Sequence, residues 1–151
     1  MQPPPFRILC TEDDVDTRDL ITFVLKSSNF EVVTTETPEL AIEIAQDFSF
    51  DLYLVDNWMP RMSGPDLCRA IRRFDTQTPI LFYSGAGYET DKAAAYANGA
   101  QGYLVKPVDN DKLVAEVRRL IVESRSVQTT QRTQVIVDET AKPLVRYASA
   151  S

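Results

Sequence analysis

The sequence predicts one α/β domain whose parallel five-stranded sheet is covered by helices on both faces. Five short apolar runs, rich in β-branched and aromatic residues, alternate with five segments of helical period, as in repeated βα units. The 151 residues are 44% hydrophobic and 25% charged, a composition typical of a single globular domain with a core. The expected strands are Phe6–Thr11, Glu31–Thr35, Leu52–Asp56, Ile80–Ser84 and Gly102–Val105.

Residues with strong positional preferences mark the first two helices. The first helix is expected from Val15 to Ser28 and ends at Asn29, a residue that tolerates a left-handed C-terminal turn. The second has Thr37 as N-cap and Pro38 at the first helical position. Their expected inward-facing residues are Leu20, Ile21, Val24 and Leu25 in the first helix and Leu40, Ala41, Ile44, Ala45 and Phe48 in the second.

The other three helices are expected on the same grounds. The third follows Ser63-Gly64-Pro65, and the fifth begins after Asp109 or Asn110 as its cap. The fourth, around Thr90–Asn98, is apolar mainly through alanines, which bury little area, so it is expected to be the most mobile. The expected inward-facing residues are Leu67, Ile71 and Phe74 in the third helix and Leu113, Val114, Val117, Leu120 and Ile121 in the fifth.

The periodic pattern stops near Ser124. We therefore expect the domain to occupy residues 6–124, and residues 125–151 to form a flexible tail or, alternatively, an extra edge strand or partner-binding segment. The roughly 27 residues after Ser124 are too few for an independently folding output domain. Unless the chain is a fragment, its output must then be a partner protein or self-association.

Charge and composition exclude several classes of function. The net charge is −6. Residues 1–124 carry 12 Lys and Arg against 20 Asp and Glu, so the body is acidic and a poor match for direct binding to nucleic acid. The chain has no histidine, which excludes Ser-His-Asp and Cys-His catalysis and excludes this chain as its own phosphohistidine donor.

No feature of the sequence points to export or to a membrane. The N-terminus lacks the basic and apolar regions of a signal peptide, and no uncharged apolar run reaches about 18 residues. Cys10 and Cys68 lie in a predicted strand and a predicted helix and suit buried free thiols better than a disulfide. A cytoplasmic protein is expected.

Polar residues follow four of the five predicted strands. The first strand ends in Glu12-Asp13-Asp14, the third in Asp56, the fourth in Ser84 and the fifth in Lys106. The carboxyl ends of parallel strands converge on one crevice, so these residues form the candidate site. The second strand offers only Thr34, Thr35 and Glu36, as expected for an edge strand in the order 2-1-3-4-5.

This set of side chains suits phosphoryl transfer with a hard cation. Carboxylates gathered in one crevice repel one another, and Mg²⁺ held by oxygen ligands relieves the repulsion. A carboxylate beside the metal can act as a nucleophile and form an acyl phosphate. Ser84 and Lys106 would then supply the hydrogen bond and the positive charge that align the phosphoryl group.

Four sequence blocks in this order resemble the bacterial two-component response-regulator receiver family, in its single-domain, chemotaxis-like form. The resemblance spans residues 6 to about 124 and implies a flavodoxin-like (βα)5 fold. The blocks are Ile8-Leu9-Cys10-Thr11-Glu12-Asp13-Asp14, Asp51-Leu52-Tyr53-Leu54-Val55-Asp56-Asn57-Trp58-Met59-Pro60 through Gly64, Pro79-Ile80-Leu81-Phe82-Tyr83-Ser84-Gly85-Ala86, and Gly102-Tyr103-Leu104-Val105-Lys106-Pro107.

The resemblance implies a role for each motif residue. Glu12 and Asp13 would bind Mg²⁺, a register that Arg18 supports, and Asp56 would be both phosphoacceptor and metal ligand. The remaining implied roles are the backbone carbonyl of Trp58 on the metal, Ser84 and Lys106 on phosphoryl oxygens, a cis Lys106-Pro107 peptide, and Tyr103 as the aromatic that turns inward with Ser84.

Some of these residues have plainer explanations. Asp14 suits an N-cap better than a metal ligand, and Tyr103 could be ordinary strand packing. Trp58 and Ala86 occupy positions that tune dephosphorylation in the family, so the lifetime of the phosphoryl group is open.

The function implied is a signalling switch that catalyses only its own phosphorylation and dephosphorylation and is otherwise not an enzyme. A sensor histidine kinase or phosphotransfer protein would phosphorylate Asp56, and the face of the fourth helix, fifth strand and fifth helix would signal to an effector protein or a second copy. One alternative is a pseudo-receiver that binds proteins without phosphorylation. Another is an aspartyl phosphatase or Toprim-like enzyme, but Asp56-Asn57-Trp58 lacks the second acid of their Asp-x-Asp pair.

Overall fold

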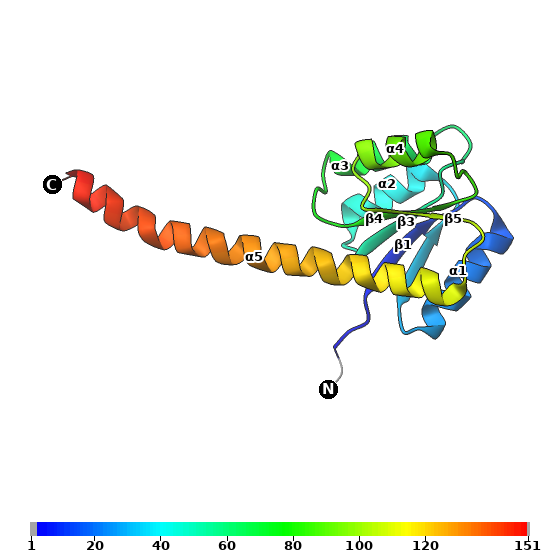
Figure 1. Cartoon of the computed structure of the whole chain (residues 1–151), viewed down its shortest axis with the longest axis horizontal. Coiled ribbons are helices and arrows are strands. Elements are labelled where there is room, and N and C mark those ends of the chain that lie inside the picture. The colour runs from blue at the N-terminus through cyan, green and yellow to red at the C-terminus, as the bar shows by residue number, and fades with distance from the viewer. Residues whose placement is uncertain (1–2, 151) are drawn as a thin grey trace.

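The computed structural model describes residues 3–150, with side chains described as far as Gln131. It contains a five-stranded parallel sheet in the order β2-β1-β3-β4-β5, as predicted, and five helices (Figure 1). The strands are β1 (Arg7–Thr11), β2 (Glu31–Thr35), β3 (Leu52–Val55), β4 (Ile80–Ser84) and β5 (Gly102–Val105). The helices are α1 (Val15–Ser27), α2 (Pro38–Asp47), α3 (Gly64–Arg72), α4 (Glu89–Ala97) and α5 (Asn110–Ala150).

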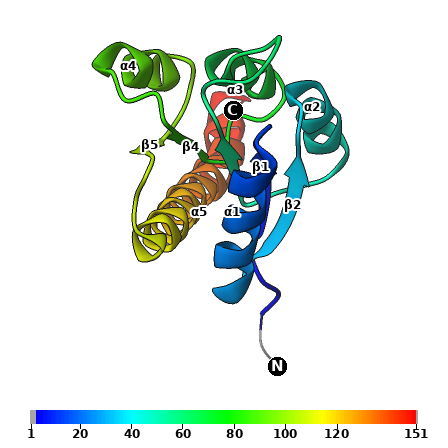
Figure 2. The same cartoon turned by 90° about the vertical axis from the view of Figure 1, so that its right-hand side faces the viewer.

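The sheet separates two hydrophobic cores. Helices α1 and α5 cover one face, and α2, α3 and α4 cover the other (Figures 1 and 2). Successive side chains of a strand point to opposite faces, so Leu52 and Leu54 join the core under α1 and α5, whereas Tyr53 and Val55 join the core under α2 to α4. Every residue of β3 and β4 is buried, which explains their uninterrupted apolar sequences.

Three of the predicted helix-end residues take their expected positions. The Asp14 carboxylate accepts hydrogen bonds from the Thr17 amide (2.9 Å) and hydroxyl (2.6 Å), so Asp14 caps α1. Thr37 caps α2 by accepting from the Leu40 amide at 3.2 Å. Asn29 has φ 69 after α1, as expected for a left-handed C-terminal turn.

Four of the predicted inward-facing residues are instead exposed: Leu20 (52%), Leu40 (42%), Phe48 (58%) and Phe74 (40%). Phe48 and Phe74 come after the last residues of α2 and α3, so the helical period no longer sets their direction. Leu20 and Leu40 lie at the margin of the apolar stripes of α1 and α2, beside Ile21 and Ala41, which take the buried positions.

Helix α5 continues to Ala150. For residues after Ser124 the sequence predicted a flexible tail or, alternatively, an extra edge strand or partner-binding segment, and the role of this part of the chain stays a prediction. The first residues of this continuation contact the segments that precede β1 and β3. Arg125 forms an ion pair with Asp51, and its guanidinium carbon lies 5.0 Å from the Phe6 ring centroid. Beyond this point the helix leaves the domain (Figure 1).

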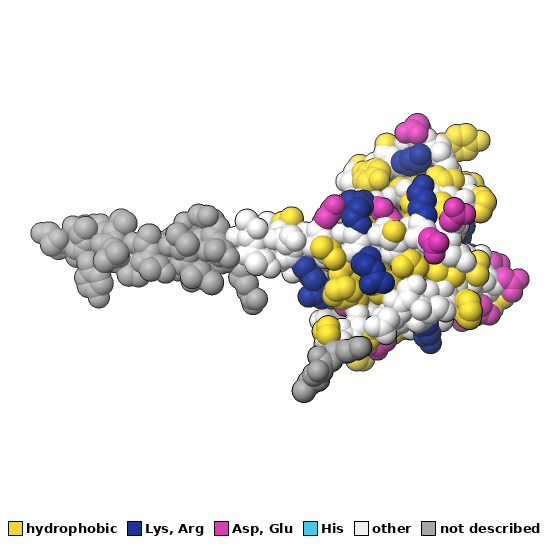
Figure 3. Space-filling view, turned by 60° about the horizontal axis from the view of Figure 1, so that its bottom comes forward, with side chains coloured by type: hydrophobic (Ala, Val, Ile, Leu, Met, Phe, Trp, Pro, Cys, Tyr) yellow, Lys and Arg dark blue, Asp and Glu magenta, His cyan; other side chains and the backbone are white. Residues whose placement is uncertain are grey.

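On the face drawn in Figure 3, acidic and basic side chains are interspersed, and neither forms a continuous patch.

None of the helices within residues 3–150 combines the length and hydropathy needed to cross a membrane.

Arg72, the last residue of α3, connects the two loops that lead into β4 and β5. Its guanidinium donates to the carbonyl oxygens of Asp75 (2.9 Å), Thr78 (2.8 Å) and Gly99 (2.9 Å). It also donates to the side-chain oxygen of Gln101 at 2.8 Å, and Gln101 in turn accepts from the amide of Ile80 at 2.8 Å. One side chain therefore sets the positions at which β4 and β5 begin.

We expect Arg72→Ala to lower the free energy of unfolding by about 2–4 kcal/mol, because it removes charged hydrogen bonds and leaves partly buried carbonyl groups without a donor. Urea denaturation measures this loss. The matched control is Arg73→Ala at the exposed neighbouring position, which should change stability by no more than about 0.5 kcal/mol. Equal losses in the two variants would contradict the role assigned to Arg72.

Candidate functional site

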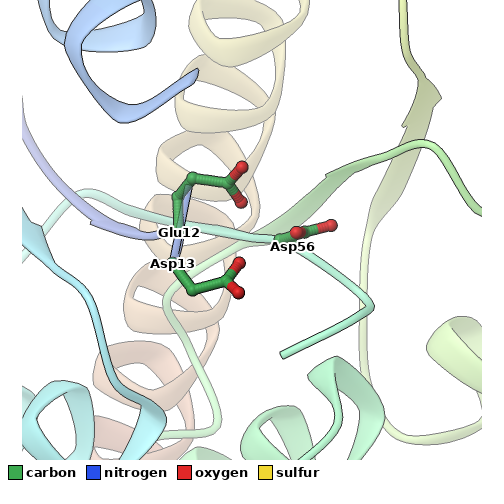
Figure 4. Close-up of side chains that lie close together, drawn as sticks. All are labelled: Glu12, Asp13 and Asp56. Atoms are coloured by element: carbon green, nitrogen blue, oxygen red, sulfur yellow. The ribbon is translucent and has the colours of Figure 1, made fainter. Parts of the chain in front are cut away.

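Three carboxylates meet where β1 and β3 end. Glu12 and Asp13 directly follow β1, and Asp56 directly follows the neighbouring strand β3. Each of the three offers one oxygen, and these oxygens all lie within 4.8 Å of one another. Figure 4 shows the side chains of Glu12 and Asp13 next to each other and directed toward Asp56. The predicted acidic cluster is therefore present in the structure.

Backbone hydrogen bonds to adjacent strands fix these positions. The Glu12 amide donates to the Thr35 carbonyl at 3.1 Å, and the Asp56 amide donates to the Thr11 carbonyl at 3.2 Å. Arg18 donates to the Glu12 carbonyl at 2.9 Å, so the first turns of α1 hold the acidic pair in place. The positions of the carboxylates are therefore set by the sheet and by α1, and not by contacts among the three acids.

Glu12 is the most enclosed of the three acids, with 2% of its surface exposed. Lys106 lies 3.0 Å from Oε1 of Glu12, whereas Oε2 is buried and has no hydrogen-bond partner among the described residues. Burial, followed by the nearby carboxylate of Asp56, raises the pKa of Glu12 to about 7, although Lys106 acts in the opposite direction.

The donor set fits a hard divalent cation. Carboxylate oxygens with no histidine or thiol donor are the ligands that Mg²⁺ prefers, and Mg²⁺ is commonly held by one or two carboxylates together with water. A buried polar atom without a partner is costly, and Oε2 of Glu12 is such an atom beside two further acids. A bound cation would supply that missing interaction and reduce the repulsion among the three carboxylates.

Ser84 and Lys106 lie at the ends of β4 and β5, as the sequence predicted. The Lys106 amide donates to the Ser84 carbonyl at 2.8 Å, and the Lys106-Pro107 peptide is cis. Ser84 is fully buried, and its hydroxyl oxygen accepts from the Ala86 amide at 3.2 Å. Lys106 reaches across to Glu12, so it faces the acidic cluster from the opposite side.

Tyr103 lies on the inner side of the loop that joins β4 to α4. Its ring stacks on Phe82 with centroids 5.5 Å apart and an interplanar angle of 10°. Its hydroxyl donates to the Ala86 carbonyl at 2.5 Å and accepts from Asn57 Nδ2 at 3.1 Å. These contacts go beyond ordinary strand packing, because they join Tyr103 to two loops of the site.

Two residues of the site were given no role by the sequence. Asn57 is 5% exposed and contacts Tyr103, although nothing in its position after a strand predicts that partner. Gly64 begins α3 so close to the site that a Cβ atom there would lie 2.6 Å from the Asp56 carbonyl oxygen. The Trp58 side chain is 63% exposed, and the metal-ligand role of its backbone carbonyl stays a prediction.

Comparison with known proteins gives similarities over most of the chain. Residues 8–118 match the family described as response regulator receiver domain. The chain is 34% identical over 119 residues to the cell cycle transcriptional regulator CtrA of Caulobacter vibrioides, which covers 79% of this chain and 52% of CtrA. The chain thus spans about half the length of the curated relatives it matches.

Solved structures give the same result for the fold. Chemotaxis protein CheY4 of Vibrio cholerae has a TM-score of 0.71 and 29% identity, over 77% of this chain and 98% of CheY4. The receiver domain of the sensor histidine kinase PA1611 of Pseudomonas aeruginosa, solved with a magnesium ion in its active-site cleft, has a TM-score of 0.73 and 24% identity, over 78% and 98% of the two chains. Fold, site and family match agree: this chain belongs to the response-regulator receiver family.

Proposed function

We propose that this chain is a phosphorylation-dependent switch of a two-component system and that Asp56 is its phosphoacceptor. The observation that carries the proposal is the placement of Asp56 within 4.8 Å of the carboxylates of Glu12 and Asp13, with Lys106 opposite them. Because this chain contains no histidine, the phosphohistidine donor would be a separate protein, either a sensor histidine kinase or a phosphotransfer protein. The transfer would take place in the cytoplasm.

Glu12, Asp13 and Asp56 would hold Mg²⁺, together with the backbone carbonyl of Trp58. When bound, the ion would neutralise charge on the carboxylates and on the phosphoryl oxygens. Oε2 of Glu12, which is buried without a partner, supports this assignment. Lys106 already balances the other oxygen of Glu12 from 3.0 Å away, which leaves the remaining carboxylate oxygens to face the ion.

The transfer needs little from the protein beyond alignment and charge. A carboxylate oxygen of Asp56 attacks phosphorus, the bond between phosphorus and the donor imidazole nitrogen breaks, and the electron pair stays with that nitrogen. Lys106 and Ser84 contact phosphoryl oxygens from the ends of β5 and β4. Asp56 is 9% exposed, so only a small part of its surface is open to a donor.

Phosphorylation adds a charge of about −1.5 to −2. We propose that this charge draws Ser84 and Lys106 inward and shifts an existing equilibrium of the loop between β4 and α4. Ser84 is already joined to that loop through the Ala86 amide. The altered face of α4, β5 and α5 would then bind an effector protein or a second copy of the chain.

We expect acetyl phosphate with Mg²⁺ to add the mass of one phosphoryl group to the wild-type protein and to leave Asp56→Asn unchanged. Intact-mass spectrometry makes the measurement. The control Asp16→Asn removes an exposed acid of α1 outside the cluster and should be phosphorylated like the wild type. The proposal fails if Asp56→Asn gains the same mass as the wild type. It also fails if no protein gains mass, a result that would favour the alternative function of a pseudo-receiver.

We expect Mg²⁺ to bind about tenfold more weakly at pH 6 than at pH 8, because Glu12, with a pKa of about 7, is mostly protonated at the lower pH and must lose its proton to bind metal. The fluorescence of Trp58, the only tryptophan, reports binding without any phosphodonor. Glu12→Gln should bind more weakly and lose most of this pH dependence. Equal affinities at the two pH values in the wild type would contradict the assignment of Glu12 as a ligand.

A further inference from the structure

Asn57, directly after the proposed phosphoacceptor, joins two loops of the site through Tyr103. Its Nδ2 donates to the Tyr103 hydroxyl at 3.1 Å, and that hydroxyl donates to the carbonyl of Ala86 at 2.5 Å. Asn57 belongs to the loop after β3, Tyr103 to β5 and Ala86 to the loop after β4. A continuous hydrogen-bonded path therefore runs from the phosphoacceptor loop to the loop before α4.

Burial and a backbone hydrogen bond fix the position of Asn57. Its side chain is 5% exposed, and its backbone carbonyl accepts from the Gly64 amide at 2.9 Å. The packing leaves no space at Gly64, where a Cβ atom would lie 2.9 Å from the Asn57 Cα and 2.6 Å from the Phe82 ring. The start of α3 thus fixes the backbone from which the Asn57 amide reaches Tyr103.

Tyr103 is well suited to receive this contact. Stacking on Phe82 sets the plane of its ring, and burial raises the pKa of its phenol, so the hydroxyl stays protonated and can donate to Ala86 while it accepts from Asn57. The ring is therefore held by Phe82 of β4, whereas the hydroxyl is held by the Asn57 amide and the Ala86 carbonyl in the loops after β3 and β4.

We propose that Asn57 is a positioning residue that holds Tyr103 inward in the unphosphorylated protein. This biases the loop between β4 and α4 toward the arrangement that phosphorylation favours, an inference that rests on the proposed function. The Ala86 amide donates to Ser84 Oγ at 3.2 Å, so Ala86 receives Tyr103 through its carbonyl and Ser84 through its amide. A change at Asp56 would reach Ala86 by two routes, one through Ser84 and one through Asn57 and Tyr103.

The bias has a measurable size. A hydrogen bond of ordinary net strength changes the ratio of two conformers on the order of fivefold when it is lost. Removal of the Asn57 amide should therefore let Tyr103 leave its inward position for an appreciable fraction of the time. In such a variant, phosphorylation would also have to restore the inward position of Tyr103.

The test is ¹⁹F NMR of the full chain labelled with fluorotyrosine, with Tyr103→Phe used to assign the Tyr103 signal. Two variants are compared with the wild type without phosphodonor: Asn57→Ala, and Asn57→Leu, which has nearly the shape of asparagine and leaves no cavity. We expect the Tyr103 signal of both variants to move toward the signals of Tyr88 and Tyr96, which are exposed. Acetyl phosphate with Mg²⁺ should return it, and should move the wild-type signal little.

Asn98→Ala is the matched control, because it also removes an asparagine side-chain hydrogen bond, from Nδ2 to the Ala94 carbonyl at 2.7 Å. Its Tyr103 signal should stay at the wild-type position. The inference is overturned if the unphosphorylated wild type and both Asn57 variants give the same Tyr103 signal. A protein that gains no mass from acetyl phosphate would overturn the proposed function instead, and the unphosphorylated spectra would still decide the role of Asn57.

Discussion

The close approach of three carboxylates at one edge of the sheet is the constraint on which the rest of this site depends. Like charges within 4.8 Å of one another oppose folding unless something balances them. Lys106 balances one oxygen of Glu12, but the other is buried and without a partner. Within the described residues the balance is therefore incomplete, and a divalent cation would complete it, because its charge and its preference for oxygen ligands suit these carboxylates.

The strand order explains how such a crowded site can form at all. Because β1 and β3 are neighbours in the centre of the sheet, the residues that follow them emerge side by side, and backbone hydrogen bonds to Thr11 and Thr35 hold them there. β4 and β5 then bring Ser84 and Lys106 to the same edge from the other side. The hydrophobic cores above and below the sheet provide the free energy that keeps the repelling groups together.

Much of this arrangement could be predicted from the sequence because it follows from short-range patterns. Apolar runs mark the strands, and residues after parallel strands share an edge whatever the packing details, so Glu12, Asp13 and Asp56 were predictable together. Burial at the margins of helices was not, because Phe48 and Phe74 come after their helices end. The helical course of residues 125–150 could not be predicted either, since polar residues such as Thr129 and Thr130 carry no apolar period.

The contact between Asn57 and Tyr103 was unpredictable for a different reason. The two residues are 46 positions apart, and the backbone of Asn57 is packed tightly against Gly64, a contact that no local pattern reveals. The same packing has a consequence for switching. A loop held only by Ser84 would respond to the phosphoryl group alone. With Tyr103 held inward by Asn57, as we propose, the loop would already favour one arrangement before phosphorylation, which would then change a ratio of conformers that is biased from the start.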